Sequence, residues 1–210
     1  QEGADMANKD FINDKYKGAF KWIHLSKPFA FNSMEGKSVP VEPNTAGAKY
    51  SISWTLSAEE GAAFEAKCKE HFEARKAEDK KIKTDFGAVH GLKKNEDSTW
   101  SVTASRKSMN AKGEMAGVPV INQYQDPLAD LDLWDGSVGT ALFSMYPAPN
   151  PSSGNWGISL NLLKVQITEA VRGGDDSDFE KVERPQPKDP FGLPPAEAAK
   201  TEEIFDEIPF

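Results

Sequence analysis

The hydrophobic period changes abruptly at Ser57, from that of a strand to that of a helix. Before this point, residues 49–56 (KYSISWTL) alternate between apolar side chains and Ser or Thr, which is typical of a half-buried strand. From this point, Ser57 and Glu60 have the spacing of a capping box, and apolar side chains recur at helical spacing to about Ala77. The pattern therefore predicts one strand followed directly by one long helix.

Two long strand-like runs, residues 137–147 and 155–171, stand on either side of the sequence PAPNPSSG. This order predicts a hairpin with a Pro/Ser/Gly loop. In the second run the apolar side chains change phase at Leu162, and an extra residue inserted into one strand of a pair has that effect. We therefore expect a bulge near Leu162.

Residues 18–25 and 98–105 add two further strands to the inventory. Five strands with one long α-helix after the second strand predict a mainly β fold, a five-stranded OB-fold Greek-key barrel. The segment between Lys107 and Gly136 is too long for a passive turn, so we expect a functional or packing loop there. Tyr124 and Trp134 would form a small apolar core within this loop.

The length and composition allow one domain with appendages. With 210 residues, 38% of them hydrophobic, the chain can bury one core. We expect that core in residues 15–171, after residues 1–14, an expression scar (QEGAD) and a flexible N-terminus. A Pro/Gly/acidic linker (172–200) and an acidic tip (201–210) would form a disordered C-terminal tail. Neither an apolar run of about 18 residues nor a leader is seen, so we expect a cytoplasmic protein without a membrane partner.

The net charge of −8 at first argues against a nucleic-acid partner. Its distribution weakens that objection. Residues 172–210 hold 11 acidic and 5 basic residues, whereas residues 1–171 hold 22 acidic and 20 basic residues. The expected body is thus nearly neutral, and a local positive groove remains compatible with the composition.

The sequence carries none of the common signatures of a catalytic or metal site. It has no phosphate-binding loop, no G-x-S-x-G, no H-E-x-x-H and no Cys-x-x-Cys. Cys68 and His71 supply two neighbouring ligands, whereas structural zinc takes four. The acidic run 175–180 lacks the glycine and glutamate of a calcium loop. We expect no enzymatic activity, no cofactor and no metal.

Aromatic side chains beside bases point instead to single-stranded nucleic acid. Such ligands are held by a positive groove and by aromatic faces on which bases stack, each stack contributing about 1–3 kcal/mol. The candidate stacking residues lie on predicted strands or at their ends, and are Tyr146, Trp156, Phe29, Phe31, Trp54 and Trp100. The candidate phosphate-binding residues are Lys27, Lys49, Arg106 and Lys107.

Each of these aromatic residues also has a packing interpretation. Trp54 and Trp100 share the apolar phase of their strands, which favours the core. Trp22 lies on a strand of mixed phase, and the pattern does not decide between core and surface. Phe29 and Phe31 are also placed to cover an end of the barrel. For the pair at the hairpin end, Tyr146 and Trp156, stacking and packing are equally compatible with the sequence.

The order of segments resembles, across most of the chain, the single-stranded DNA-binding proteins of tailed bacteriophages. The resemblance rests on FKWIHLSKPFAF, AKYSISWTL running into AKCKEHFEA, GVPVI, the hairpin segment and GGDDSDFE. The final DEIPF is similar to the acidic Ile-Pro-Phe ending of bacterial single-stranded DNA-binding proteins. The resemblance implies an OB fold, DNA binding with little sequence preference, and a tail that recruits proteins of replication, recombination or repair.

Within that resemblance, the tip residues Asp206, Glu207, Ile208, Pro209 and Phe210 would contact the partner protein. Ile208 and Phe210 would enter an apolar pocket, the carboxylates would meet its basic rim, and Pro209 would limit the conformations lost on docking. The same acidic tail would compete with DNA for the protein's own groove. The alternative is that the tip packs on the body as an extra element.

We therefore expect a single-stranded DNA-binding protein that acts in the cytoplasm of an infected bacterial cell. One alternative is an interaction adaptor whose small β-barrel binds protein and not DNA. Another is an accessory subunit of a nuclease or recombinase, against which the lack of an acidic cluster in the barrel counts. The sequence leaves the oligomeric state open.

Overall fold

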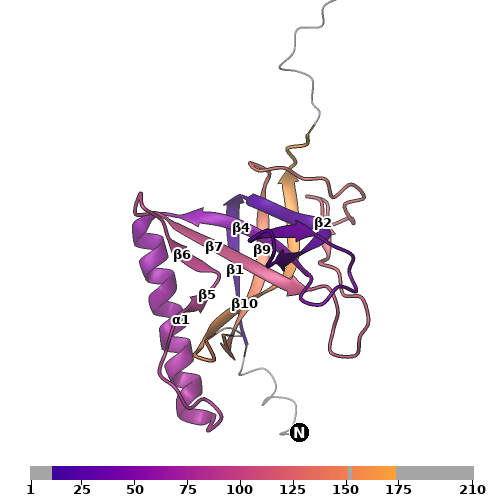
Figure 1. Ribbon diagram of the computed structural model, residues 1–210. Coiled ribbons are helices and arrows are strands. Elements are labelled where there is room, and N and C mark those ends of the chain that lie inside the picture. Colours follow the sequence, from indigo (N-terminus) through magenta and orange to yellow (C-terminus); the bar gives the residue numbers. More distant parts are fainter. Residues whose placement is uncertain (1–10, 151–152, 174–210) are drawn as a thin grey trace, which may run out of the picture. The chain divides into compact units, whose positions relative to one another are not determined.

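The computed structural model describes residues 11–150 and 153–173, so the predicted linker and tip lie almost entirely outside the described residues. The described chain is mainly β with one long α-helix (Figure 1). In chain order its elements are β1 (Ile12–Ala19), β2 (Lys21–Asn32), β3 (Lys37–Pro40), β4 (Lys49–Leu56), α1 (Ala58–Glu78), β5 (Val89–His90), β6 (Leu92–Lys94), β7 (Trp100–Lys107), β8 (Val120–Ile121), β9 (Val138–Pro149) and β10 (Trp156–Glu169).

The strands form one sheet with the order β1-β9-β10-β7-β4-β2-β3. The short strands β5 and β8 pair with β10, and β6 pairs with β7. The mainly β class with one long helix is confirmed. The predicted count of five strands is wrong, because the sheet of the described residues has ten. The predicted five-stranded closed barrel is also wrong, because the order of paired strands runs from one edge strand, β1, to another, β3. The helix follows the fourth strand and not the second.

The strand predicted at residues 18–25 is divided in two at Phe20. Its side chain is fully buried, its N–H donates to the carbonyl of Ser137 at 2.9 Å, and its carbonyl accepts from the N–H of Gly136 at 2.9 Å. The backbone then passes through a positive φ of 49° at Trp22. This corner explains the mixed phase of the sequence there. It also leaves a separate first strand, which begins at Ile12, before the expected start of the body at residue 15.

Helix α1 begins with the predicted capping box. The N–H of Glu60 donates to Ser57 Oγ at 3.2 Å, and the N–H of Ser57 donates to the Glu60 carboxylate at 2.9 Å; an N-cap of this kind contributes about 1 kcal/mol. The helix packs on the sheet through Cys68 and Phe72, both fully buried. Burial raises the pKa of the Cys68 thiol to about 12, so this side chain stays protonated and packs as an apolar group.

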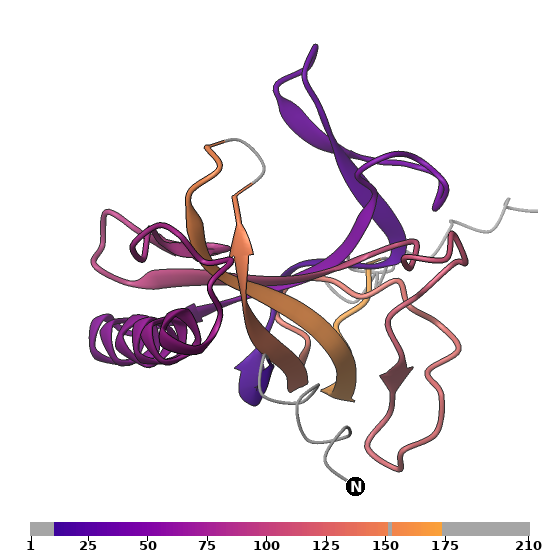
Figure 2. The same cartoon turned by 90° about the horizontal axis from the view of Figure 1, so that it is seen from below.

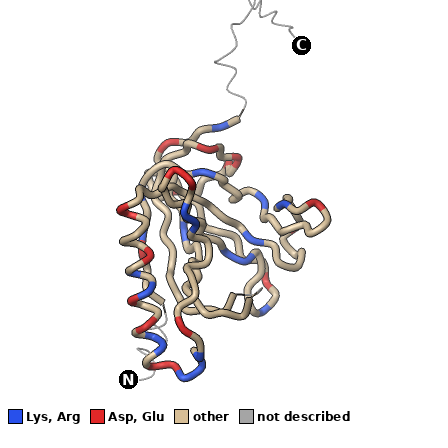
Figure 3. Tube along the Cα trace, turned by 60° about the vertical axis from the view of Figure 1, so that its left-hand side comes forward, with Lys and Arg blue, Asp and Glu red and all other residues tan. Residues whose placement is uncertain are grey.

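The solvent side of α1 carries charges of both signs along its length (Figure 3). Several of these charges are paired, as in Lys76 with Asp85 at 2.5 Å and Arg75 with Glu78 at 2.5 Å. This face is therefore not a uniformly basic patch. Among the described residues, no helix combines the length and the apolar character that crossing a bilayer requires.

The hairpin and its bulge are both found where the sequence places them. β9 pairs with β10 in antiparallel register, and the register shifts between Leu162 and Lys164. The long segment after β7 packs against the core through Val118, Val120 and Leu133. Its larger aromatic residues lie at the surface instead. Tyr124 is 75% exposed and Trp134 is 56% exposed. The prediction that these two residues form a small apolar core within the loop is therefore wrong.

Gly61 on α1 gives a test of how the helix packs against Trp100. A Cβ at this position would lie 2.1 Å from carbons of the Trp100 indole. Alanine normally stabilises a helix interior by about 1 kcal/mol over glycine. We expect Gly61→Ala instead to lower the free energy of unfolding by about 1–3 kcal/mol, as measured by urea denaturation. The loss should shrink when Trp100 is replaced by Leu, and a stabilised Gly61→Ala variant would contradict this packing.

Candidate nucleic-acid interface

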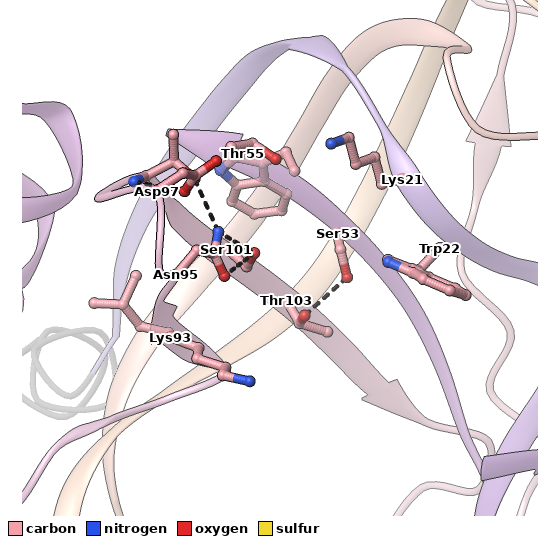
Figure 4. Close-up of a pocket in the computed structure, with 13 residues that line it drawn as sticks. Lys21, Trp22, Ser53, Thr55, Lys93, Asn95, Asp97, Ser101 and Thr103 are labelled. Atoms are coloured by element: carbon pink, nitrogen blue, oxygen red, sulfur yellow. Dashed lines mark hydrogen bonds between the residues drawn. The ribbon is translucent and has the colours of Figure 1, made fainter. Parts of the chain in front are cut away.

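A groove crosses β4 and β7 on the face opposite the core. Two hollows of about 560 and 490 Å³ share Trp22, Ser53 and Thr103, and so form one continuous depression. The walls come from β2 on one side and from residues 91–97 on the other. Figure 4 shows the first hollow, with Lys21 and Trp22 on one side of the Ser53–Thr103 pair and Lys93 and Asn95 on the other.

The floor of the groove consists of small hydroxyl side chains. In the antiparallel ladder of β4 and β7, Ser53 lies opposite Thr103 and Ser51 lies opposite Ser105. The hydroxyl oxygens of Ser53 and Thr103 are 2.8 Å apart. Ser and Thr add little volume above the strands, so they leave space for a ligand. Their hydroxyls both donate and accept hydrogen bonds, which makes the floor tolerant of different polar partners.

The β2 wall presents aromatic side chains to solvent. Trp22 is 68% exposed and Phe31 is 70% exposed. Phe29 stacks on His24 with ring centroids 3.6 Å apart and an interplanar angle of 9°. Figure 2 shows the β2–β3 hairpin that carries Phe29 and Phe31 projecting from the rest of the sheet. Exposed aromatic rings gathered at one groove are typical of a binding surface.

His24 acts in this wall as an aromatic ring and not as a charge. Burial lowers the pKa of its imidazole, and the nearby Asp135 carboxylate opposes that shift only in part. The ring is therefore neutral at pH 7. Its Nδ1 lies 3.2 Å from Ser51 Oγ, which connects the stacked His24–Phe29 pair to the floor.

Basic side chains outnumber acidic ones around the groove. Lys21, Lys49 and Lys93 line it, and Asp97 is the one acidic residue among its described lining. Hydrogen bonds from the Thr99 hydroxyl and backbone N–H lower the pKa of Asp97, so this carboxylate is ionised at neutral pH and engaged in its own turn. The groove is thus locally positive.

Lys49 and Lys107 lie directly opposite each other in the β4–β7 ladder. Directly opposed residues share one face of the sheet, and like charges in such a pair destabilise it. Both side chains are exposed, and neither forms an ion pair with a carboxylate in the described part of the chain. An anionic ligand at this end of the groove would relieve the repulsion.

The sequence-predicted residues are divided between the groove and other places. Phe29, Phe31 and Lys49 line the groove. Lys107 stands at its end on the same face, and Lys27 is exposed on β2 outside the lining. Four of these residues, Phe29, Phe31, Lys49 and Lys107, thus come together at one end of the groove.

The predicted tryptophans of β4 and β7 have packing contacts. Trp54 borders the groove but is only 2% exposed, and its ring stacks on Tyr16 with centroids 4.9 Å apart. Trp100 lies against Gly61 of α1, with the Lys94 ammonium 5.8 Å from its ring centroid. Neither indole offers a free face to the groove, so we assign Trp54 and Trp100 to the core and the helix contact.

Three further predicted residues lie away from the groove lining. Tyr146 is half-buried, with its ring centroid 5.3 Å from that of Phe11. Trp156 packs against the core cluster at the start of β10. Arg106 is partly buried and lies opposite Tyr50 in the ladder, in the phase of the core and not of the floor. We therefore leave these three out of the candidate interface.

Sequence reasoning missed Trp22 and His24 as site residues, together with the hydroxyl floor. A signal for the floor was present, because Ser and Thr alternate with core residues in both 49–56 and 100–107. The pairing of these two segments is what places their hydroxyls in one surface. In the described ranges, no three His, Cys, Asp or Glu side chains gather as metal ligands.

Two tryptophans that differ in exposure give a test of the site. We expect Trp54→Ala to lower the free energy of unfolding by about 3–5 kcal/mol, because it empties a buried site. Trp22→Ala should change it by less than about 1 kcal/mol, because most of this side chain is already in water. Guanidinium denaturation followed by far-ultraviolet circular dichroism measures both. Equal losses would contradict the placement of Trp22 at the surface.

Neither a family model nor a curated protein sequence matches this chain. Solved structures of similar fold do exist. The single-stranded DNA-binding protein from bacteriophage Enc34 superposes with a TM-score of 0.50 and 17% identity, covering 81% of this chain and 87% of that one. Its C-terminal truncation gives 0.51 and 16%, covering 78% and 92%.

Another solved structure of similar fold is gp2.5, a single-stranded DNA-binding protein encoded by bacteriophage T7. It superposes with a TM-score of 0.50 and 16% identity, and the match covers 83% of this chain and 98% of that one. At such identities the likeness concerns the fold. The described chain thus has a fold similar to that of phage single-stranded DNA-binding proteins.

Proposed function

We propose that this protein binds single-stranded DNA in the groove over β4 and β7, with little preference for sequence. The observation that carries the proposal is the groove itself, in which Trp22 and Phe31 expose their rings beside lysines. The similar fold of phage proteins that bind single-stranded DNA supports it. It also agrees with the resemblance found in the sequence.

The geometry favours unpaired bases over a duplex. Stacking on Trp22 or Phe31 needs a base whose flat face is free, and in a duplex neighbouring bases cover those faces. Every base has such a face, so stacking discriminates poorly between sequences. The floor hydroxyls of Ser53 and Thr103 accept or donate as required, and they add affinity without fixing one base.

The lysines around the groove would bind phosphates. Each phosphate that Lys21, Lys49 or Lys93 neutralises releases a counterion, and for single strands the logarithm of affinity then falls with that of salt by about 0.7 per contact. The affinity should therefore decrease steeply with salt. This local effect does not require a positive net charge on the whole chain.

In the cell, the protein would protect unwound DNA and recruit replication or recombination proteins. This part of the proposal rests on the sequence resemblance, with residues 15–171 as the DNA-binding body and Asp206 to Phe210 as the contact for partners. The place of action would be the cytoplasm of an infected bacterium. We assign it binding and recruitment, and no catalysis.

The first test is a titration with oligothymidine followed by intrinsic tryptophan emission. We expect quenching by the single strand and not by duplex DNA, and a lower affinity at higher salt. Trp22→Ala and Phe31→Ala should each weaken binding by about 5- to 150-fold, the equivalent of 1–3 kcal/mol per stack, with an unchanged salt slope. Lys49→Gln should reduce that slope by about 0.7.

Matched controls come from outside the groove. Tyr124 is as exposed as Phe31 and lies outside the groove lining, so Tyr124→Ala should bind as the parent does. Lys112→Gln should likewise leave the salt slope unchanged. If the parent protein shows no response to any single strand, the adaptor that binds protein becomes the better account.

The acidic tip provides a separate test. We expect a chain without residues 201–210 to bind oligothymidine more tightly at low salt, because the tip no longer competes for the groove. The difference should fade as salt rises. Phe210→Ala keeps the acidic side chains and separates charge from the aromatic contact. An affinity that is the same with and without the tip at low salt would rule out this competition.

A further inference from the structure

The backbone of Trp22 adopts a conformation that bulky residues rarely take. Its φ is 49°, in the left-handed region, a strained conformation for a non-glycine residue that persists only where the surroundings hold it. Burial does not hold this side chain, because it is 68% exposed. Trp22 also borders both hollows of the groove, so the strain occurs at the centre of the candidate interface.

A carboxylate accepts a hydrogen bond from the backbone at this point. The N–H of Trp22 donates to Oδ1 of Asp135 at 2.7 Å, across 113 positions of sequence. A charged acceptor makes this a short and strong hydrogen bond. Asp135 is itself exposed and belongs to the segment 134–137, which follows the long connection after β8.

The segment 134–137 is fixed on both sides. On the β2 side, Gly136 N–H donates to the carbonyl of Phe20 and Phe20 N–H donates to the carbonyl of Ser137, both at 2.9 Å. On the β10 side, the N–H of Val171 donates to Ser137 Oγ at 2.9 Å. Asp135 therefore cannot simply follow Trp22 if the backbone relaxes, and the carboxylate serves as a fixed point for the corner that precedes the β2 wall.

The charge of Asp135 works against the ligand. It stands near enough to His24 to influence the pKa of that imidazole, and so lies close to the aromatic wall. A negative charge there repels phosphates. An acid at this position is explained by the hydrogen bond that it accepts, because the acceptor atom supports binding while the charge opposes it.

We propose that Asp135 is a positioning residue for DNA binding, which keeps the Trp22 indole at the groove by accepting its backbone N–H. The inference rests on the proposed function for the role of the indole. The hydrogen-bond acceptor, and not the charge, is the part of Asp135 that matters. Asparagine retains such an acceptor, whereas alanine removes it.

The test compares Asp135→Asn with Asp135→Ala in the full chain, by titration with oligothymidine at several salt concentrations. We expect Asp135→Asn to bind as tightly as the parent or more tightly. Asp135→Ala should bind at least about 5-fold more weakly, with an unchanged salt slope, since a stacking contact is lost and no phosphate contact. If both variants bind more tightly than the parent, Asp135 acts through its charge alone and the proposal is wrong.

A double-mutant cycle tests whether the effect passes through the indole. In the Trp22→Ala background, Asp135→Ala should no longer reduce the affinity, because the ring to be positioned is absent. A loss of the same size with and without the indole would show a general structural effect and overturn the proposal.

The indole N–H signals in a nitrogen–proton correlation spectrum report on Trp22 without DNA. The Trp22 signal, assigned by its absence in Trp22→Phe, should shift or broaden in Asp135→Ala and stay in place in Asp135→Asn. Unchanged signals of Trp54, Trp100 and Trp156 show that the fold is intact. If the Trp22 signal does not move in Asp135→Ala, positioning is refuted. If it moves as expected but the parent does not bind DNA, the proposed function fails and the positioning stands.

Discussion

The pairing of β4 with β7 determines both the core and the groove. Successive side chains of a strand point to opposite faces, so the register that buries Ile52, Trp54 and Val102 also brings Ser53 opposite Thr103 on the other face. A slip of one residue would exchange the two sets. Because burial of an indole and its neighbours strongly disfavours that slip, the core fixes the floor of the groove.

The walls of the groove are supported differently from its floor. The floor belongs to a ladder of eight residue pairs, with α1 and the β9–β10 hairpin behind it. The aromatic wall belongs to β2, whose pairing with β4 is interrupted by two register shifts. Hydrogen bonds from the 134–137 segment support the start of this wall, at Phe20 before β2 and at Trp22 within the first of those shifts. The floor thus belongs to an uninterrupted ladder, whereas the wall depends on a few long-range contacts.

This difference explains what the sequence could predict. The helix, the hairpin and the bulge at Leu162 depend on local patterns, and all three were predicted correctly. The position of Trp22 depends on a contact with a residue more than 100 positions away. The mixed hydrophobic phase of its strand did not decide between core and surface. For Tyr146 and Trp156 the sequence left stacking and packing equally open. A hairpin end usually lies in solvent, but Tyr146 contacts Phe11 and Trp156 packs against the core cluster, which a single-sequence pattern does not reveal.

Net charge is a poor guide to how this chain would meet a polyanion, because it takes no account of where the charges lie or of which ones are paired. Lys67 contacts Asp14 at 2.8 Å and Lys76 contacts Asp85 at 2.5 Å, so these bases are engaged at the surface around α1. Among the described residues, Lys21, Lys49 and Lys93 form no such ion pairs, and all three line the groove. The field that a phosphate experiences is set by nearby charges, since salt screens those beyond about 10 Å. A nearly neutral body can therefore hold a positive groove, because three lysines line it beside a single carboxylate, that of Asp97.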